Sequence, residues 1–382
     1  MHISFSIILK IIFILSVPAT LAFGQQIPTS FAISPEKWSA ANLAGFEASI
    51  EKERKQNHIP GLSAGIVYGD KLIWKKGFGF ADIANQQVPD EHTVYQIASV
   101  TKTFSSILLM QQVEEGKASL EDPIAKYNID LGARWGSDER IKVKHLLTHT
   151  AMGGTMNGFK PGYQFRYNGD WYNRLKEVIE QSSGRSFGML LLDSILNPLG
   201  LKETVPSTDD SVNFSLTGKD KTAFLRKVAK PYDWQNKQIV PVDYHYIFGP
   251  AAGIMSSVHD LAQYSMAIDA NNFIEAETWQ QVFTPFKTPK GKTIQYGLGW
   301  FVGYHKGLKL LWHTGWWTGY SALFVKIPEK DLTLIILANS QDLTRPYMTS
   351  NFWKWLNPFD KNLNKNLLDS DFAASFYKHF VK

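Results

Sequence analysis

The strand-like segments of this chain gather at its two ends, and helical patterns fill the middle. Apolar runs rich in β-branched and aromatic residues, bounded by turn residues, are typical of strands. Five such runs occur, at residues 62–68, 72–80, 308–312, 321–327 and 332–338. Because strands need partners for their backbone hydrogen bonds, the two groups are predicted to pair into one sheet although they are far apart in sequence.

The middle of the chain has apolar residues at helical spacing. Helices are predicted at residues 100–115, 143–147, 172–181, 188–195 and 257–268. Another amphipathic helix is predicted before the first strand, capped by Ser34 with Pro35 in its first turn, and with Phe46 and Ile50 on its apolar face. Residues 207–248 are polar and irregular, which favours loops or an insertion.

These patterns predict a fold of the α/β class, α+β type, with an antiparallel sheet flanked by helices. Within a domain of residues 25–356, the sheet lobe is expected to span about residues 33–98 and 250–345, and an inserted helical lobe about residues 99–249. Residues 357–382 are assigned to a C-terminal tail. The functional site is expected between the lobes, and a continuous parallel sheet would contradict this arrangement.

The composition excludes several classes of protein. With 382 residues, 44% hydrophobic and 20% charged, the chain is neither disordered nor a polytopic membrane protein. The net charge is +5, but basic residues form no runs, so no nucleic-acid partner is expected. There is no cysteine, which excludes disulfides, zinc ribbons, iron–sulfur clusters and thiol catalysis.

The N-terminus has the pattern of a signal peptide. Residues 1–10 end in Lys10, residues 11–17 are apolar, and small residues follow Pro18, so cleavage is expected after Ala22 or Gly24. The alternative is a retained membrane anchor, but seven apolar residues are few to span a bilayer. The mature protein is therefore predicted to be periplasmic or secreted, with no stable membrane association once residues 1–24 are removed.

Two serine motifs compete for the role of nucleophile. Residues 61–65 read Gly-Leu-Ser-Ala-Gly and match the G-x-S-x-G elbow of α/β-hydrolases, which would make Ser63 the nucleophile. That elbow needs a strand before the serine and a helix after it. Here the order is reversed, so Ser63 is expected to serve packing, and an α/β-hydrolase remains an alternative.

Ser99-Val100-Thr101-Lys102 matches the second motif, S-x-x-K. The tetrad occurs four times, but only Ser99 lies just before a long apolar helix. The start of a helix supplies unpaired N–H groups and partial positive charge. Residues three apart share a helix face, so the Lys102 amine can reach the Ser99 hydroxyl, which is the geometry of an activated nucleophile.

From this motif onward the chain resembles the serine β-lactamase and penicillin-binding-protein superfamily, in its class C and DD-peptidase branch. The resemblance runs from about Ile59 to Asn339, and its pieces occur in the family's order. They are YQIASVTKTF at 95–104, HLLTHT at 145–150, Pro161-Gly162 with Phe165, Tyr167 and Tyr172, AGIMSS at 252–257 with Asp260-Leu261, YGLGW at 296–300, and His313-Thr314-Gly315.

The resemblance implies a β-lactamase/transpeptidase-like fold and a role for each matching residue. Ser99 would attack an amide or ester carbonyl, and Lys102 would take its proton. Tyr167 would be the second base and acid. The backbone N–H groups of Ser99 and Trp316 would form the oxyanion hole. His313, Thr314 and Gly315 would lie on an edge strand, with His313 and Thr314 facing the substrate or the proton network, and Trp317 would add to an aromatic wall.

Two departures from the family pattern concern substrate binding. The usual Tyr-x-Asn motif reads Tyr167-Asn168-Gly169, so the asparagine that would hold a substrate amide is missing, and Asn168 is the candidate substitute. The third motif has His313 where most β-lactamases have lysine. Both changes weaken a fixed grip on an anionic β-lactam and argue against efficient antibiotic hydrolysis.

No cofactor is expected, and no metal. His145 and His149 are four apart, but no glutamate follows His145, so the H-E-x-x-H mechanism lacks its base.

The chain is predicted to be an exported serine hydrolase acting through an acyl-enzyme on Ser99, with D-alanyl peptides, small esters and β-lactams as candidate acyl donors. A true class C-type β-lactamase and a catalytically impaired protein that binds peptidoglycan or β-lactams are the alternatives besides the Ser63 hydrolase. Activity is expected to fall below pH ~6 through His313.

Overall fold

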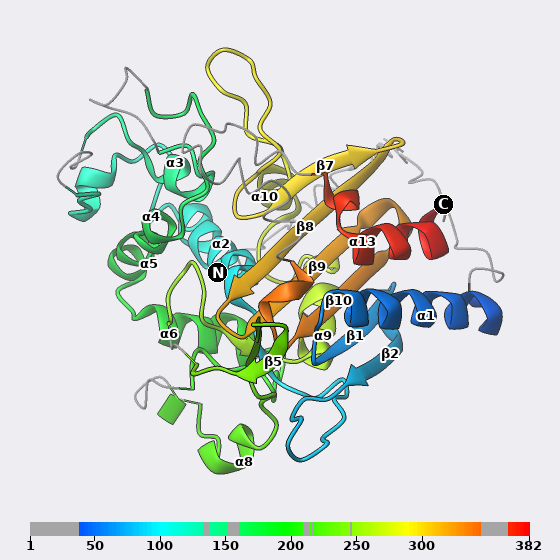
Figure 1. Ribbon diagram of the computed structural model, residues 1–382. Helices are drawn as coiled ribbons and strands as arrows, with labels where there is room; N and C mark the ends of the chain where they lie inside the picture. The colour runs from blue at the N-terminus through cyan, green and yellow to red at the C-terminus, as the bar shows by residue number, and fades with distance from the viewer. Residues whose placement is uncertain are drawn as a thin grey trace, which may run out of the picture. The chain divides into compact units, whose positions relative to one another are not determined.

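The centre of the molecule is an antiparallel sheet whose strands come from both ends of the chain (Figure 1). The computed structural model describes residues 38–132, 138–151, 160–208, 214–215, 217–244, 247–344 and 366–382. Within them the strand order is β2-β1-β10-β9-β8-β7. The strands are β1 (Gly61–Tyr68), β2 (Lys71–Gly79), β7 (Phe301–His305), β8 (Leu308–Trp317), β9 (Tyr320–Ile327) and β10 (Leu332–Ala338).

The pairing of β1 with β10 joins the two ends of the chain. Leu62 lies opposite Ala338 and Tyr68 opposite Leu332, in an unbroken antiparallel register. The other pairs of the sheet are also antiparallel. The predicted α+β class with an antiparallel sheet is therefore confirmed. β7 is a strand that the sequence analysis did not assign.

Both faces of the sheet are covered, which explains why its inner strands are continuously apolar. Side chains alternate along a strand, so neighbours enter different layers. On β10, Leu334 and Ile336 pack in the layer that holds Phe46 of α1 (Ala40–Gln56). Ile335 and Leu337 pack in the opposite layer, under α2 (Thr101–Glu114) and α9 (Val258–Asp269).

α1 packs against the C-terminal helix α13 (Asp371–Phe376) on one face of the sheet (Figure 1). Phe46 and Ile50 are fully buried there, as expected for the apolar face of α1. The helix begins at Ala40, and Ser39 caps it by accepting the N–H of Asn42. The α1 helix thus starts later than predicted, because Ser39, closer to the apolar residues, is its cap. Ser34 and the predicted signal peptide lie outside the described residues.

The remaining helices are mostly short. They are α3 (Val143–Leu147), α4 (Gly169–Asn173), α5 (Leu175–Ser183), α6 (Phe187–Leu191), α8 (Lys221–Leu225) and α10 (Ala276–Val282). The segment at 207–248, predicted to be irregular, holds α8 and a hairpin of β4 (Tyr232–Gln235) and β5 (Gln238–Pro241). No helix in the described parts of the chain is both long and apolar enough to cross a bilayer.

A two-residue ladder brings the first motif to the other half of the chain. β3 (Tyr95–Gln96) pairs with β6 (Met255–Ser256), and Ile97 N–H donates to Ile254 O at 3.0 Å. The chain then turns into α2. The residues around Ser99 are thus held beside the 250–256 segment before the helix begins.

Candidate active site

Ser99 lies in a short 3-10 turn that leads directly into α2. The turn, η2, spans Ala98–Val100, and Ala98 has a left-handed φ of 46°. A non-glycine residue in that region is strained, and such strain persists where surrounding packing enforces it. Ala98 is fully buried, whereas Ser99 is partly exposed. The fold therefore presents this serine at the start of a buried helix, as the S-x-x-K motif predicts.

The side chain of Lys102 reaches Ser99 from the first turn of α2. Its Nζ lies 3.1 Å from Ser99 Oγ, and the residue is 1% exposed. Burial disfavours the charged amine and lowers the pKa of Lys102 to about 7, while the more distant Asp170 carboxylate opposes this change. A substantial fraction of Lys102 is therefore neutral at neutral pH and able to accept the Ser99 proton.

Uncharged groups hold the Lys102 amine in place. Nζ donates to Ala251 O at 2.8 Å, and Asn173 Oδ1 accepts the Ala251 N–H at 3.0 Å. The rings of Tyr167 and Tyr172 each lie with their centroids 5.0 Å from Nζ. The sequence analysis missed Asn173 and Ala251, because their role depends on a loop contact that no local pattern encodes.

Tyr167 lies beside both members of the serine–lysine pair. Burial raises the pKa of its hydroxyl, and the Ser99 side chain lowers it only in part. The phenol is therefore protonated at neutral pH and suited to donate a proton. The centroid of the Tyr167 ring lies 4.1 Å from that of the tilted His149 ring and 6.3 Å from that of the parallel Phe301 ring.

Asn168 does not point its amide oxygen at a substrate. It is the N-cap of α4, and its Oδ1 accepts the Trp171 N–H at 3.1 Å. Its backbone N–H donates to His149 Nδ1 at 3.2 Å. Capping the helix engages this oxygen, so Asn168 could hold a substrate mainly through its amide nitrogen, and its role as substitute for the family asparagine stays a prediction. At Gly169 an added Cβ would meet no described atom within 4 Å.

β8 carries the third motif but is not the edge strand that was expected. β7 lies outside it in the sheet. However, β7 pairs only with Leu308–Trp312, so the following residues pair in the sheet with β9 alone. An added Cβ on Gly315 would lie 2.2 Å from Ile97 O, so only glycine lets β8 approach the Ser99 turn this closely. Thr314 is buried, Trp317 is half-buried, and Trp316 is exposed.

His313 faces the interior of the protein. It is fully buried; its Nδ1 lies 2.7 Å from Thr314 O and its Nε2 lies 3.0 Å from the Tyr296 hydroxyl. Because a carbonyl can only accept, Nδ1 carries the proton and Nε2 accepts from Tyr296. Burial and the nearby Lys102 lower the pKa of His313 to about 3. Both ring nitrogens are thus engaged inside the protein, and the lowered pKa argues against a titration near pH 6. The predicted part of His313 in the proton network of the site stays a prediction.

His149 is a buried neighbour of Tyr167. The sequence analysis considered it only as a metal ligand four residues from His145. It has a φ of 54°, and its ring lies 5.0 Å from the ring of Tyr296. Burial and Lys102 hold its pKa well below the ordinary value. His145 is occupied elsewhere, because its Nδ1 accepts the Lys142 N–H at 3.0 Å. His149 therefore supports Tyr167 from behind, and the His145/His149 spacing reflects two separate packing roles.

The other serine motif has a packing explanation. Ser63 is fully buried in β1, where its hydroxyl bonds to Asp90 O at 2.6 Å and lies 3.0 Å from the Tyr95 hydroxyl. An added Cβ on Gly65 would lie 2.5 Å from a methyl group of Val258, so this glycine lets α9 approach the sheet. These contacts and the antiparallel sheet argue against an α/β-hydrolase elbow at Ser63.

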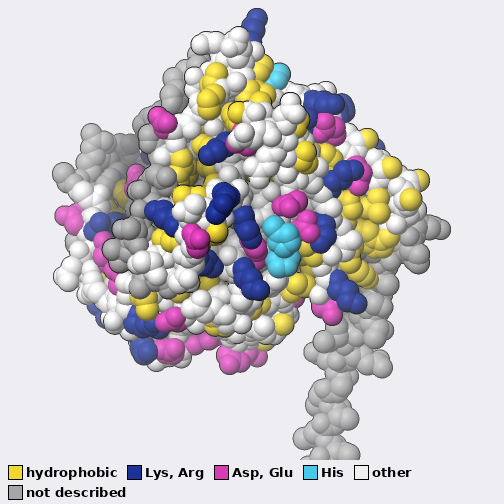
Figure 2. Space-filling view, turned by 90° about the horizontal axis from the view of Figure 1, so that it is seen from below, with side chains coloured by type: hydrophobic (Ala, Val, Ile, Leu, Met, Phe, Trp, Pro, Cys, Tyr) yellow, Lys and Arg dark blue, Asp and Glu magenta, His cyan; other side chains and the backbone are white. Residues whose placement is uncertain are grey.

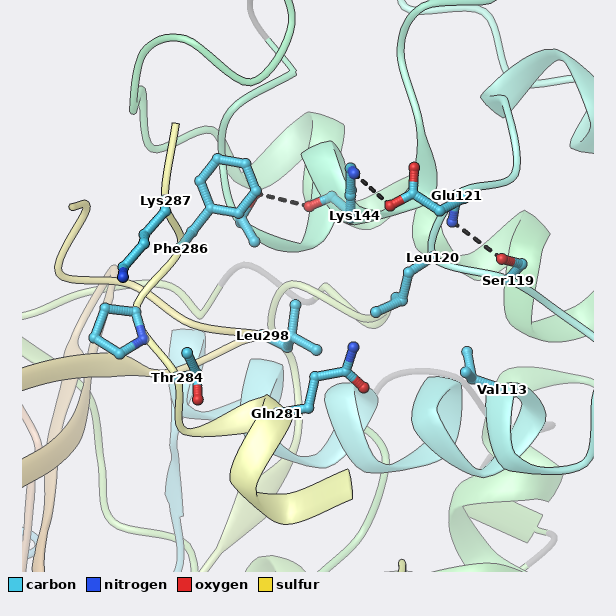
Figure 3. Close-up of a pocket in the computed structure, with 12 residues that line it drawn as sticks. Val113, Ser119, Leu120, Glu121, Lys144, Gln281, Thr284, Phe286, Lys287 and Leu298 are labelled. Carbon is cyan, nitrogen blue, oxygen red and sulfur yellow. Dashed lines mark hydrogen bonds and ion pairs between the residues drawn. The ribbon is translucent and has the colours of Figure 1, made fainter. Parts of the chain in front are cut away.

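An apolar cavity of about 610 Å³ lies near the other end of α2 (Figure 3). Val113 lies on one side of it and Phe286 on another, with the Lys144–Glu121 ion pair at its rim. Leu298, which also lines the cavity, is tied to α2 because its carbonyl oxygen accepts the Ser106 hydroxyl at 2.6 Å. The residues that line this cavity do not include Ser99, Lys102 or Tyr167.

Comparison with known proteins agrees with this geometry. The β-lactamase family model matches residues 46–352. Protein flp of Staphylococcus aureus strain MW2 is 24% identical over 327 residues, which are 76% of this chain and 61% of that protein. Penicillin-binding protein 4* of Bacillus subtilis strain 168 is 23% identical over 313 residues, 72% of this chain and 67% of that one.

The fold also matches a solved structure, the octameric penicillin-binding protein homologue from Pyrococcus abyssi. The TM-score is 0.69 with 26% sequence identity, over 86% of this chain and 79% of that one. This chain spans only 61% of the length of the flp proteins that it matches. The family model nevertheless covers most of the chain. The chain belongs to the β-lactamase family, within the superfamily of serine β-lactamases and penicillin-binding proteins.

Proposed function

We propose that this protein is an exported serine hydrolase that cleaves an amide or ester bond through a covalent acyl-enzyme on Ser99. One observation carries the proposal: the Lys102 amine lies 3.1 Å from Ser99 Oγ, in a buried position that lowers its pKa to about 7. A lysine that is partly neutral at working pH can act as the base that a serine nucleophile needs.

Acylation follows from these contacts. Neutral Lys102 takes the hydroxyl proton while Ser99 Oγ forms a bond to the substrate carbonyl carbon, and the carbonyl oxygen becomes an oxyanion. The backbone N–H groups of Ser99 and Trp316 are the donors proposed to stabilise it. When the tetrahedral intermediate collapses, the bond to the leaving nitrogen or oxygen breaks, and that atom receives a proton from Tyr167. Lys102 then returns its proton to Tyr167, which restores both groups.

Deacylation uses the same groups with water as the nucleophile. Water loses a proton to Lys102 and attacks the acyl carbon, and the bond to Ser99 Oγ breaks. Lys102 gives the proton it took from water to Ser99 Oγ as the carboxylic acid leaves, which restores the neutral amine and the serine hydroxyl. Thr314 and Trp317 lie on the same strand as the proposed oxyanion donor Trp316 and are the candidates for contact with the acyl group.

The proposed acyl donors are D-alanyl peptides first, then small esters, then β-lactams. The B. subtilis relative is named a penicillin-binding protein, and the P. abyssi structure is that of a penicillin-binding protein homologue. These names support recognition of a D-alanyl-like group. The open space at Gly169 and the inward orientation of His313 leave a β-lactam carboxylate and amide with fewer fixed partners. A true class C-type β-lactamase is therefore the weaker candidate.

The test is intact-protein mass spectrometry over seconds to minutes after addition of benzylpenicillin, p-nitrophenyl acetate or a D-alanyl-D-alanine peptide. Release of product is followed in the same tube. We expect an acyl-sized mass increase or turnover with at least one donor, and neither in Ser99→Ala. Activity that survives in Ser99→Ala would overturn the proposal. Absence of both adduct and turnover with all three donors would favour the impaired binding protein.

Two further variants separate the alternatives. Ser63→Ala should keep its activity, because Ser63 lies buried within β1 away from the Lys102 amine; loss of activity with Ser63 variants alone would favour the elbow hypothesis. Gly169→Asn restores the family side chain in open space without a left-handed φ. It should strengthen reaction with benzylpenicillin relative to the ester, which lacks an amide for that side chain to hold.

Export through residues 1–24 remains part of the proposal. The N-terminal sequence of the protein recovered outside the cytoplasm should begin after Ala22 or Gly24. Recovery with an intact N-terminus in the membrane fraction would instead support the retained anchor.

A further inference from the structure

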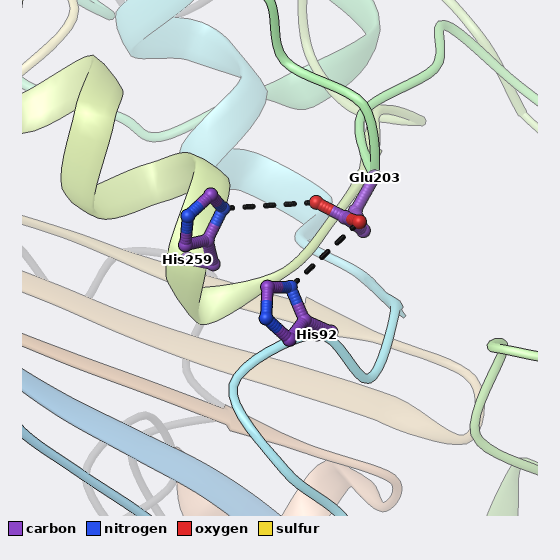
Figure 4. Close-up of side chains that lie close together, drawn as sticks. All are labelled: His92, Glu203 and His259. Carbon is purple, nitrogen blue, oxygen red and sulfur yellow. Dashed lines mark ion pairs between the residues drawn. The ribbon is translucent and has the colours of Figure 1, made fainter.

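Two partly exposed histidines and a buried glutamate from three separate segments lie close together, in a cluster that does not include the serine–lysine pair (Figure 4). His92 lies in the loop between β2 and β3, Glu203 lies in the turn before α8, and His259 lies in the first turn of α9. Their ligand-type atoms all lie within 4.8 Å of one another. The segments are tied together by the His259 N–H, which donates to Glu91 O at 2.9 Å.

We propose that His92, Glu203 and His259 bind one Zn²⁺ ion. His92 Nδ1 lies 3.7 Å from Glu203 Oε1, and His259 Nδ1 lies 3.7 Å from Glu203 Oε2. In a tetrahedral site with metal–ligand bonds of about 2.0–2.2 Å, neighbouring ligand atoms are roughly 3.3–3.6 Å apart. Each histidine–glutamate separation needs to close by only a few tenths of an ångström, and rotation of the exposed histidine side chains would bring the whole set, now within 4.8 Å, around one ion. Two imidazoles and one carboxylate are also a common ligand set for zinc.

His92 Nδ1 is a second, independent indication of a missing partner. The atom is buried and makes no hydrogen bond, although the His92 side chain as a whole is 44% exposed. At 3.7 Å from Glu203 the contact is too long for a hydrogen bond. A ring nitrogen directed at a carboxylate across that gap has room for a metal ion between them.

Asp260 supports the same cluster from beneath. Its Oδ2 accepts the Glu203 N–H at 2.8 Å and the Thr204 hydroxyl at 2.7 Å, while its Oδ1 lies 3.2 Å from His259 Nδ1. Since His259 Nδ1 would carry no proton when it binds the metal, Oδ1 is placed to complete a fourth coordination position. His259 Nε2 lies 3.3 Å from Gln263 Nε2, which leaves Nδ1 as the nitrogen that faces the carboxylates.

The ammonium group of Lys227 would compete with a metal ion for Glu203. Lys227 Nζ lies 3.0 Å from Glu203 Oε1, and its side chain is 49% exposed, so it can swing into solvent when a metal binds. On the side away from Glu203, His92 Nε2 lies 3.8 Å from Glu91 Oε1, which Lys75 also contacts. Histidine side chains and mixed charges are visible on the face of the molecule shown in Figure 2. A metal ion bound here would hold three segments of the chain together without using the catalytic groups.

The test is a calorimetric titration of ZnCl₂ into metal-stripped, full-length protein without a polyhistidine tag, at neutral pH. We expect one Zn²⁺ per chain, with affinity reduced about tenfold or more in His92→Ala and in His259→Ala, because each loses a direct ligand. These side chains are 44% and 34% exposed, so the variants should fold, which thermal unfolding would check. Lys227→Ala should bind zinc more tightly, because the competing ammonium is gone.

The matched control is His305→Ala, a partly exposed histidine outside the cluster, whose removal should leave zinc binding unchanged. A visible absorption spectrum of the Co²⁺ form gives an independent reading of tetrahedral coordination. The proposal is overturned if no saturable binding occurs, or if zinc binds equally well to wild type, His92→Ala and His259→Ala. Tighter binding in Lys227→Ala but unchanged binding in both histidine variants would also overturn this ligand set.

Discussion

Two lysines are buried on the same side of the central sheet, and their surroundings differ in a way that separates function from stability. Lys102 is 1% exposed and Lys326 is 2% exposed. Lys326 Nζ donates to Asp269 Oδ2 at 2.8 Å and to Thr333 Oγ1 at 3.2 Å. The hydrogen bonds of the Lys102 amine in the described structure go to Ser99 Oγ and Ala251 O, which are both uncharged.

The difference shows what a catalytic lysine needs. Burial lowers the pKa of both amines, but beside Lys326 the Asp269 carboxylate opposes that change through a direct ion pair. Near Lys102 the opposing charge is the exposed Asp170, which makes no ion pair with it among the described contacts. Lys326 is thus tied into an ion pair that stabilises the fold, and Lys102 is left able to lose its proton.

The largest expected effect is on activity. Lys102→Met should lower kcat/KM by about 10³-fold or more, because the base for Ser99 is lost. The same variant should unfold at a higher temperature than wild type at neutral pH, since a thioether costs less to bury than an amine. Activity assays and thermal unfolding at one pH measure both. Retained activity would remove Lys102 from the mechanism, and a lower unfolding temperature would contradict its assignment as a costly buried group.

Lys326→Met should show the opposite pattern. It removes one member of a buried ion pair and leaves the hydroxyls of Ser265 and Thr333 without the amine, so the free energy of unfolding should fall by roughly 2–4 kcal/mol. Because Asp269 is 46% exposed, its charge can return to water, and the loss should lie at the lower end of that range. Denaturant unfolding checks this, with the exposed Lys52→Met as control, and kcat/KM should stay within a few-fold of wild type. A Lys326 variant as stable as wild type would erase the contrast between the two lysines.

The sequence predicts the surroundings of Lys102 but not those of Lys326. The serine–lysine spacing and the apolar helix that follows predict the pairing of Ser99 with Lys102, because residues three apart meet on any helix. The strands were predictable for a similar reason, since a short apolar run rich in β-branched residues and bounded by turn residues is a local pattern. The partners of Lys326 come from α9 and β10 and could not be found without the tertiary structure.

The same limit explains what the sequence does not show at the site. The His-Thr-Gly motif singles out His313, but it does not say that Tyr296 and Thr314 O hold both ring nitrogens inside the protein. Asn168 looked available because the sequence does not show where α4 begins. The cluster of His92, Glu203 and His259 has no sequence spacing to recognise, since its members come from three separate segments.

The pH dependence of activity tests which group titrates. The pKa of Lys102 is lowered to about 7 and its neutral form is the active one, so kcat/KM should be level above pH 7 and fall tenfold per unit below it. His313, with a pKa lowered to about 3, should contribute nothing between pH 5 and 9. A fall centred near pH 6 that disappears in His313→Gln would contradict this assignment.

The same shift predicts a pH-dependent stability difference. Between pH 7 and the ordinary lysine value of 10.5, the unfolded chain holds the Lys102 proton that the folded protein has lost, so wild-type stability rises with pH through this window. The stability advantage of Lys102→Met should therefore be complete below pH 7 and should vanish as the pH approaches 10.5. Denaturant unfolding of both proteins at several pH values measures it.

The smallest effect is expected from Asp170→Asn. The Asp170 carboxylate raises the pKa of Lys102, so its removal should move the acid limb of the pH profile to lower pH. Asp170 is exposed, and exposed charges interact by only about 0.2–1 kcal/mol, so the rate at pH 6 should rise no more than about fivefold. High salt should reduce the difference between the two proteins, because it screens this interaction.

A limb that moves to higher pH, or a difference that survives at high salt, would show that Asp170 acts on the site through something other than its charge. An unchanged limb would show that the low pKa of Lys102 depends on burial alone, and would make the contrast with the ion-paired Lys326 still sharper.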